Sequence, residues 1–258
     1  MVNTMNYYAS DTSIVRTIWG KADTILLIFA GAAAEFALNK AVDWLYYTGR
    51  LPTDPLGRLF STVTYARQII FTSTDEAHAA VDRMRGIHSA VESSRGHAIP
   101  DSAYRDVLFM LIHYSISAYE VLERKLSPEE KEEVVNVFIK VGNRMQIKGL
   151  PHDYSSWRTM YQQHIMNNLK RSHFTADLFK QYRKHLGGLR YRILIESQKL
   201  VVSDHVRSLL NFRKPYLIKP LVKVYRLSRF VGADQLLKEL LFPALYKQRI
   251  KALDQQHM

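Results

Sequence analysis

Two histidines, His88 and His113, are the side chains in this sequence best suited to binding a metal. Each falls on the apolar side of a predicted helix, where a neutral imidazole can act as a ligand. Cysteine is absent, which excludes disulfides, thiolate zinc sites, iron–sulfur clusters and thiolate-ligated haem. A metal would therefore need histidine, carboxylate or tyrosine ligands. For either histidine taken alone, a hydrogen-bonded core residue is the more common alternative.

Motifs of the large nucleotide-binding and hydrolytic classes are missing. The sequence contains no Gly-x-x-x-x-Gly-Lys-Ser/Thr, Gly-x-Gly-x-x-Gly, Gly-x-Ser-x-Gly or His-Glu-x-x-His pattern. Paired Glu-x-x-His motifs, which a di-iron bundle needs, are also missing. Residues 75–78 spell the helicase signature Asp-Glu-Ala-His, but without a phosphate-binding loop the signature carries no such function.

Helix signals surround both histidines. Ser73 and Glu76 form a capping box that predicts the start of the helix carrying His88. Pro100-Asp101 opens the helix of His113, which is apolar on nearly all sides and is therefore predicted to be central. The helix of His88 has an apolar stripe at the spacing of a core-facing side: Ala77, Ala80, Val81, Met84, Ile87, His88 and Val91.

The rest of the chain also reads as helical. Asp54-Pro55 and the capping box of residues 127–130 predict two helix starts, the second helix running to about Ile147. The apolar stretch 25–38 is too short for a membrane span and predicts a buried helix. Residues 149–151 predict a break. Later helices are expected near 155–172, 174–186, 190–211, 216–231 and 234–253, with strand as an alternative for 189–202.

Charge divides the chain unevenly. Residues 1–139 carry 13 Lys/Arg and 17 Asp/Glu, whereas residues 140–258 carry 23 and 7. A basic half favours polyanions such as nucleic acid or anionic lipid, and Lys180–Arg192 and Phe212–Arg229 mix aromatic with basic residues. The same mixture also suits helices that pack aromatics inward and leave cations in solvent. Residues 1–10 carry no secretion signal, so we expect a cytoplasmic protein.

Four blocks of the sequence resemble the latex-clearing and MpaB-type oxygenase family, in that family's order. Residues 54–62 are similar to its Asp-Pro-x-Gly-Arg-Leu-x-x-Thr stretch, and residues 83–91 to its Arg-x-x-His-x-x-Val helix. Residues 111–120, followed by Leu-Ser at 126–127, resemble its next helix, and residues 149–161 its Gly-x-Pro-x-Asp pattern with a later Trp and Tyr. Together the blocks lie within residues 22–165.

The resemblance implies an all-α, single-domain protein with a globin-like helical core around haem b. On that basis the haem pocket is expected within about 22–165, and the basic part, about 166–258, completes the domain. The position matching His88 is the proximal iron ligand in the family, and those matching Arg58 and Thr62 are polar pocket residues. Four residues apart, Arg58 and Thr62 share one helix face and can point into one cavity.

The expected roles of these residues follow from the resemblance. Arg58 could pair with a haem propionate or stabilise bound dioxygen, to which Thr62 could donate a hydrogen bond. Arg85 is a second candidate for a propionate, with a solvated surface position as the alternative. His113 would support the site or serve as an alternative axial ligand.

The sequence also departs from the family. Ser61 stands where the rubber oxygenases have lysine, which argues against polymer cleavage, and Asn39-Lys40 replaces a His-Pro pair found in many relatives. We therefore expect an oxygenase that uses dioxygen on a small, apolar, unsaturated substrate. A peroxidase-like or sensor role would need the same ligand. A non-enzymatic module that binds nucleic acid or anionic lipid through the basic half is the main alternative, and a helical interaction protein without cofactor is the third.

Overall fold

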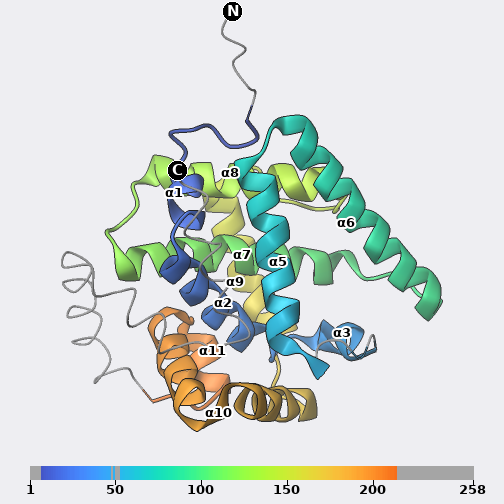
Figure 1. Cartoon of the computed structure of the whole chain (residues 1–258), viewed down its shortest axis with the longest axis vertical. Coiled ribbons are helices and arrows are strands. Elements are labelled where there is room, and N and C mark those ends of the chain that lie inside the picture. The colour runs from blue at the N-terminus through green and yellow to red at the C-terminus, as the bar shows by residue number, and fades with distance from the viewer. Residues whose placement is uncertain (1–6, 48, 50–52, 214–258) are drawn as a thin grey trace, which may run out of the picture.

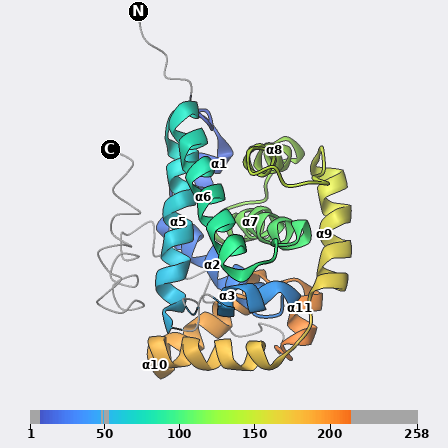
Figure 2. The ribbon, with the colours of Figure 1, turned by 90° about the vertical axis from the view of Figure 1, so that its right-hand side faces the viewer.

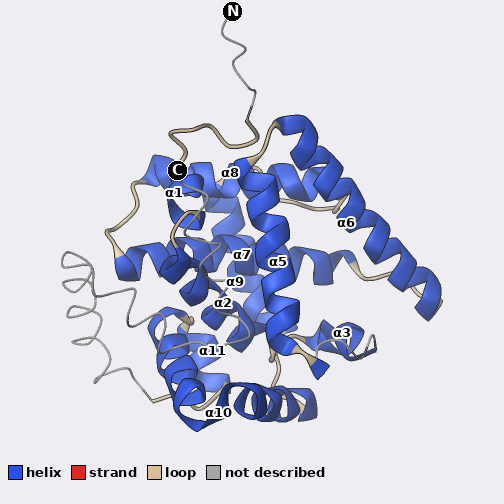
Figure 3. Cartoon of the chain, viewed as in Figure 1, coloured by secondary structure: helices blue, strands red, loops and turns tan. Residues whose placement is uncertain are grey.

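The described chain is helical throughout. The computed structural model describes residues 7–47, 49 and 53–213, and in these ranges the elements are helices, with two isolated β-bridges and no strand (Figures 1 and 3). The all-α class is thus confirmed for these residues, and the segment 189–202 is helix rather than strand. The helices predicted at 216–231 and 234–253 lie outside the described residues.

Outer helices surround the central helices α7 and α8. In Figure 2, α5 and α6 stand on one side and α9 on the other, α7 and α8 lie between them, and α10 runs across the bottom. The helices are α1 (Ile14–Trp19), α2 (Ala22–Phe36), α3 (Asp43–Tyr47), α5 (Pro55–Phe71), α6 (Thr74–Arg95), α7 (Asp101–Leu122), α8 (Pro128–Arg144), α9 (Tyr154–Asn168), α10 (His173–Val201) and α11 (Asp204–Leu209), with a short 3-10 turn at Lys40–Val42.

Local caps start the helices where the sequence predicts them. The capping boxes of Ser73 with Glu76 and of Ser127 with Glu130 are both formed, so the predicted starts of α6 and α8 are confirmed. Asp54 caps α5 by accepting a hydrogen bond from the Gly57 amide at 2.8 Å. A Cβ atom at Gly57 would overlap this carboxylate, so glycine leaves room for the cap. The pattern of residues 54–58 therefore builds a helix start that places Arg58 one turn along.

The core lies between α2 and α7. Gly31 of α2 allows this close approach, because a Cβ atom there would overlap the ring of Tyr114 and lie 2.9 Å from Val201 Cγ2. Tyr114 is fully buried, and its hydroxyl donates to Glu35 Oε2 at 2.8 Å. Tyr161 of α9 donates to the same oxygen at 2.7 Å. One buried carboxyl group therefore joins α2, α7 and α9.

A second buried polar cluster lies at the end of α2. Asp106 of α7 accepts a hydrogen bond from Asn39 at 2.6 Å and one from Asn168 at 3.0 Å. The same carboxylate lies 2.5 Å from Nδ1 of His164 on α9. Because these side chains are largely buried, Asp106 fixes the turn after α2 against α7 and α9.

The buried Glu35 predicts a pH-dependent stability. Burial raises the pKa of Glu35 to about 7 from 4.5, against the opposing hydrogen bonds of Tyr161 and Tyr114. The folded state thus binds this proton more tightly than the unfolded chain does. Its stabilising contribution is complete below about pH 4.5 and is lost as the pH rises to about 7, an effect of about 3 kcal/mol.

Urea titrations of the wild type and Glu35→Gln at several pH values measure this effect. The difference in unfolding free energy between the two proteins should shift in favour of the variant by about 2–3 kcal/mol between pH 5 and pH 8. If the unfolding free energies of the two proteins changed in parallel over that pH range, the pKa of Glu35 would not be raised by folding.

α10 is bent into two arms. Gly187 has φ 72° and ψ 174°, which interrupts the helix. The first arm packs Leu178, Tyr182 and Leu186 on a small core with Ala37 and Val42, separate from the main core. Within the described ranges, the helices lack the combination of length and apolar character that a membrane crossing requires.

Candidate functional site

A cavity of about 1580 Å³ opens between α5, α6 and α7. Ordinary small-molecule pockets occupy about 300–1,000 Å³, so this space can hold a large ligand. α5 contributes polar groups near its start, whereas most of the remaining wall is apolar, with a further side from α8. The apolar wall includes Ile69, Ile70, Met84, Ile87, Val91, Val107, Leu108, Leu111, Val137, Phe138 and Val141.

His88, Arg58 and Thr62 all line this one cavity, although α6 carries the first and α5 the other two. The three residues that the family resemblance singles out are thus brought together by the packing of α5 against α6. His88 is partly buried, and its Nδ1 atom is buried without a hydrogen-bond partner in the described part of the chain. Buried polar atoms are usually hydrogen-bonded, so this nitrogen marks His88 as an unusual core residue.

The electrostatic surroundings keep the His88 imidazole neutral. Burial is the main cause that lowers the pKa of His88, and the positive charge of Arg58 lowers this pKa further. The main-chain oxygen of Met84, one turn earlier, and the Glu92 carboxylate oppose this pKa change without reversing it. A neutral imidazole is the form that binds metals, so the cavity presents His88 in its ligating state.

Two hydroxyl groups orient Arg58. Its Nη1 atom donates to Ser61 Oγ at 3.2 Å and lies 3.5 Å from Thr62 Oγ1. Both hydroxyls in turn donate to the Arg58 main-chain oxygen, at 2.7 and 3.2 Å. Ser61 therefore acts on Arg58 and adds no second charge to this wall.

Tyr104 and Glu92 belong to the site but were not predicted from the sequence. Tyr104 lines the cavity, and its ring meets the His88 ring edge-on at 5.3 Å between centroids. Its hydroxyl donates to Glu92 Oε1 at 3.3 Å, and the same oxygen accepts the Ile99 amide at 2.8 Å. Tyr104 lies on α7 and Glu92 on α6, so their meeting depends on the packing of the two helices, for which the sequence carries no motif.

Three large apolar side chains on the cavity wall are exposed. Ile87 is 47% exposed, Val107 39% and Tyr47 50%. The apolar stripe predicted to face the core thus packs only in the first half of α6, where Ala77, Ala80 and Val81 are buried. In its second half the stripe faces the cavity, and exposed apolar walls of this kind mark ligand-binding surfaces.

α3 contributes Trp44 and Tyr47 to the cavity wall. Arg95 near the end of α6 stacks over the Trp44 ring at 3.9 Å and pairs with Asp43 at 2.8 Å. Tyr47 donates to the Ser94 main-chain oxygen at 2.9 Å. These contacts tie α3 to the outer half of α6.

Arg85 and His113 lie away from the cavity wall. Arg85 is half-buried near Asp82, whose pKa is lowered mainly by Arg144 and also by Arg85. The His113 ring stacks on Tyr161 at 4.6 Å, and burial lowers its pKa to about 4. His113 therefore belongs to the packing between α7 and α9 in this arrangement.

The described part of α10 packs an aromatic residue inward and leaves its basic residues in solvent, as the alternative to polyanion binding predicts. Tyr182 is buried in the small core, whereas Lys180, Arg183 and Lys184 are exposed. From residue 214 onward the second mixed segment, Phe212–Arg229, lies outside the described residues.

The contact between Arg58 and His88 can be tested in the protein without ligand. Arg58→Met should raise the pKa of His88, because a nearby positive charge is removed. Arg85→Met is the matched control and should leave that pKa unchanged, since Arg85 is not a source of the His88 shift. NMR titration of the imidazole protons measures both, and an equal change in the two variants would contradict the geometry.

The ligand chemistry of the site fits a cofactor that needs one protein donor. Among the described residues, no three His, Asp or Glu side chains converge as a metal-binding group. Haem requires only one axial ligand together with a large apolar space, and His88 with its cavity offers both.

Comparison with known proteins identifies the family. A family model described as "ER-bound oxygenase mpaB/B'/Rubber oxygenase, catalytic domain" matches residues 19–240. Neither a curated protein nor a solved structure matches the chain significantly. The family match confirms the resemblance carried by the four sequence blocks and covers most of the 258 residues. The chain therefore belongs to the family of mpaB/B' and rubber oxygenase catalytic domains.

Proposed function

We propose that this chain is a haem b-dependent oxygenase that uses dioxygen to oxidise a small, apolar, unsaturated substrate. The observation that carries the proposal is the neutral His88 imidazole on the wall of the large cavity. Membership of an oxygenase family supports the reaction class. Haem, when bound, would supply the activation of dioxygen.

His88 would hold the iron. Because Nδ1 is buried, Nε2 would be the nitrogen that binds the metal. Tyr104, edge-on to the ring and tied to Glu92, would limit rotation of the imidazole. An imidazole that is already held in one orientation loses less conformational freedom when it binds a metal.

Arg58 would bind an anionic group, either a carboxylate of the cofactor or negative charge that develops during the reaction. Ser61 and Thr62 hold its guanidinium in place from the same helix. The apolar remainder of the wall, including Ile69, Leu108 and Leu111, would exclude water and accept a hydrocarbon. The family description includes ER-bound members, and the cytoplasmic location expected from the sequence stays a prediction.

Haemin titration of the purified full chain tests the proposal. We expect saturation at one haemin per chain, with an absorption band near the Soret region that weakens at acidic pH as the imidazole is protonated. A protein that neither carries haem after expression with sufficient iron nor takes up added haemin would disprove the haem assignment.

A further inference from the structure

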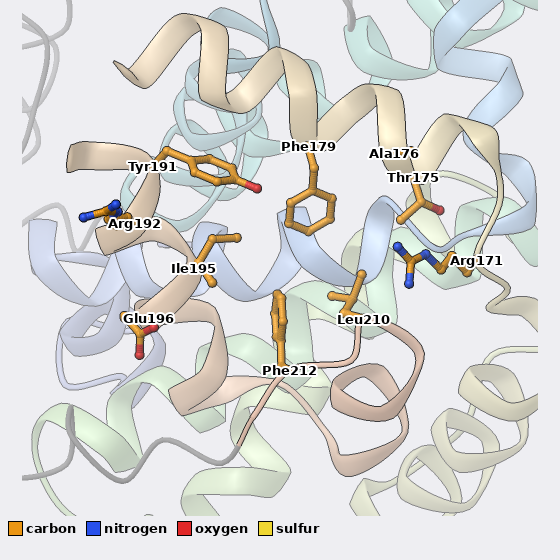
Figure 4. Close-up of a pocket in the computed structure, with 10 residues that line it drawn as sticks. All are labelled: Arg171, Thr175, Ala176, Phe179, Tyr191, Arg192, Ile195, Glu196, Leu210 and Phe212. Atoms are coloured by element: carbon orange, nitrogen blue, oxygen red, sulfur yellow. The ribbon is translucent and has the colours of Figure 1, made fainter. Parts of the chain in front are cut away.

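A second cavity, of about 630 Å³, lies in the angle between the two arms of α10. Figure 4 shows Phe179 reaching into it from the first arm, Ile195 from the second, and Leu210 and Phe212 from the segment around the end of α11. The two cavities have no lining residue in common. This groove is therefore separate from the site proposed for haem.

The backbone fixes the shape of the groove. The left-handed conformation of Gly187 creates the angle between the arms. Beyond α11, Asn211 has φ 55°, and the amide of Phe212 donates to the Arg207 main-chain oxygen at 2.9 Å. This helix-ending turn directs Phe212 back toward α10, where its ring meets Phe179 edge-on at 6.4 Å. The four apolar side chains thus form a walled space with half-buried surfaces.

Positive charge dominates around the groove. Residues 166–213 contain ten Lys/Arg and three Asp/Glu. Each of the three acidic side chains already has a partner: Asp177 accepts from Tyr46 at 2.9 Å, Glu196 pairs with Lys199, and Asp204 pairs with Arg207. A ligand that enters the groove therefore meets a net positive field, which favours an anion.

Arg171 is the cation best placed for that anion. Its Nη1 atom lies 3.1 Å from the side chain of Asn211, with the amide oxygen facing it. In Figure 4 its guanidinium is turned toward Leu210 at one end of the groove, whereas Arg192 points away at the other end. A groove with a cation at one end and apolar walls along its length suits an amphiphile with a single anionic head group.

We infer that this groove binds the anion of a fatty acid, with the carboxylate on Arg171 and the alkyl chain along Phe179, Ile195, Leu210 and Phe212. A planar guanidinium matches a carboxylate through two parallel hydrogen bonds, and the apolar walls bury the chain. Nucleic acid suits the groove less well, because a strand needs a row of cations along its backbone, whereas of the two arginines labelled in Figure 4 only Arg171 is directed into this space. The inference does not depend on haem binding.

Calorimetric titration of the full chain with dodecanoate, below its critical micelle concentration, tests this inference. We expect one saturable site, and about 10- to 100-fold weaker binding in Arg171→Met, the range for hydrogen bonds to charged groups. Lys170→Met removes the neighbouring exposed cation and should bind like the wild type. Dodecanol should bind weakly and should not distinguish Arg171→Met from the wild type.

Two tryptophan substitutions identify which cavity is occupied. Ala176→Trp fills the groove from an exposed position and should abolish dodecanoate binding, whereas Val107→Trp fills the larger cavity and should leave it unchanged. The reverse result would place the fatty acid in the larger cavity and overturn the inference. Equal affinity of Arg171→Met and the wild type, or binding to phosphatidylglycerol vesicles without binding of monomeric dodecanoate, would overturn it as well.

Discussion

His88→Ala is expected to lose stable haem binding. The substitution removes the only nitrogen ligand that the cavity wall offers among the described residues. Losing a hydrogen-bond partner of a metal ligand already costs about 10- to 100-fold in affinity, so loss of the ligand should cost at least about 100-fold. The apolar wall stays intact, and residual haemin should therefore bind weakly, with an altered absorption band.

Three measurements separate a missing ligand from a damaged fold. His97→Ala, an exposed histidine just after α6, is the matched control and should take up haemin normally. Circular dichroism should show the same helix content in both variants. Added imidazole should restore the wild-type spectrum of His88→Ala by entering the space left by the ring. An unchanged spectrum in His88→Ala alone would move the iron ligand to His113 or to another residue.

Gly31→Ala should destabilise the protein by about 2 kcal/mol. Alanine favours a helix over glycine by about 1 kcal/mol, but overpacking a core costs about 1–3 kcal/mol and occasionally more. The added methyl group would overlap the Tyr114 ring, which cannot move away easily because its hydroxyl is bonded to Glu35. We therefore place the overpacking cost at the upper end of that range.

Gly86→Ala is the same substitution as Gly31→Ala but is expected to stabilise the protein. Gly86 lies in α6, and a Cβ atom there would meet nothing within 4 Å. Only the helix preference remains, so this variant should be about 0.5–1 kcal/mol more stable than the wild type. Chemical denaturation of both variants measures the two effects, and a stabilised Gly31→Ala would refute the close approach of α2 and α7.

The sequence predicts those parts of the fold that depend on neighbouring residues. Helix starts at α5, α6 and α8 follow from Asp54, Ser73 and Ser127, because a cap and its partner lie within one turn of each other. The break at residues 149–151 and the interruption of α10 at Gly187 also have local causes. The predicted end of α8, near Ile147, lies beyond its observed end at Arg144, since helix ends depend more on tertiary contacts.

Contacts between distant helices could not be predicted. Asp106 meets His164 and Asn39 across separations of more than fifty residues, and no periodic pattern marks such a meeting. The shared carboxyl of Glu35 is hidden for the same reason, because a lone acidic residue in an apolar stretch does not reveal its tyrosine partners.

The candidate site contains features that the sequence predicts and features that it could not predict. Arg58 and Thr62 share a helix face by their spacing, but their meeting with His88 depends on how α5 packs against α6. The stripe on α6 could not reveal that its second half faces a cavity, because a core and an apolar binding wall select the same residue types. His113 lies on an equally apolar helix and packs against Tyr161.

The anchoring of α6 bears on the order in which the working protein is assembled. Ala77, Ala80 and Val81 fasten its first half to the main core, and Arg144 pairs with Asp82 from α8, whereas the outer half borders the open space. We therefore expect the helical framework to fold without the haem proposed above. Binding of the proposed haem to this framework would then stabilise the folded chain further, so the supply of haem would affect how much of the protein accumulates as well as how much is active.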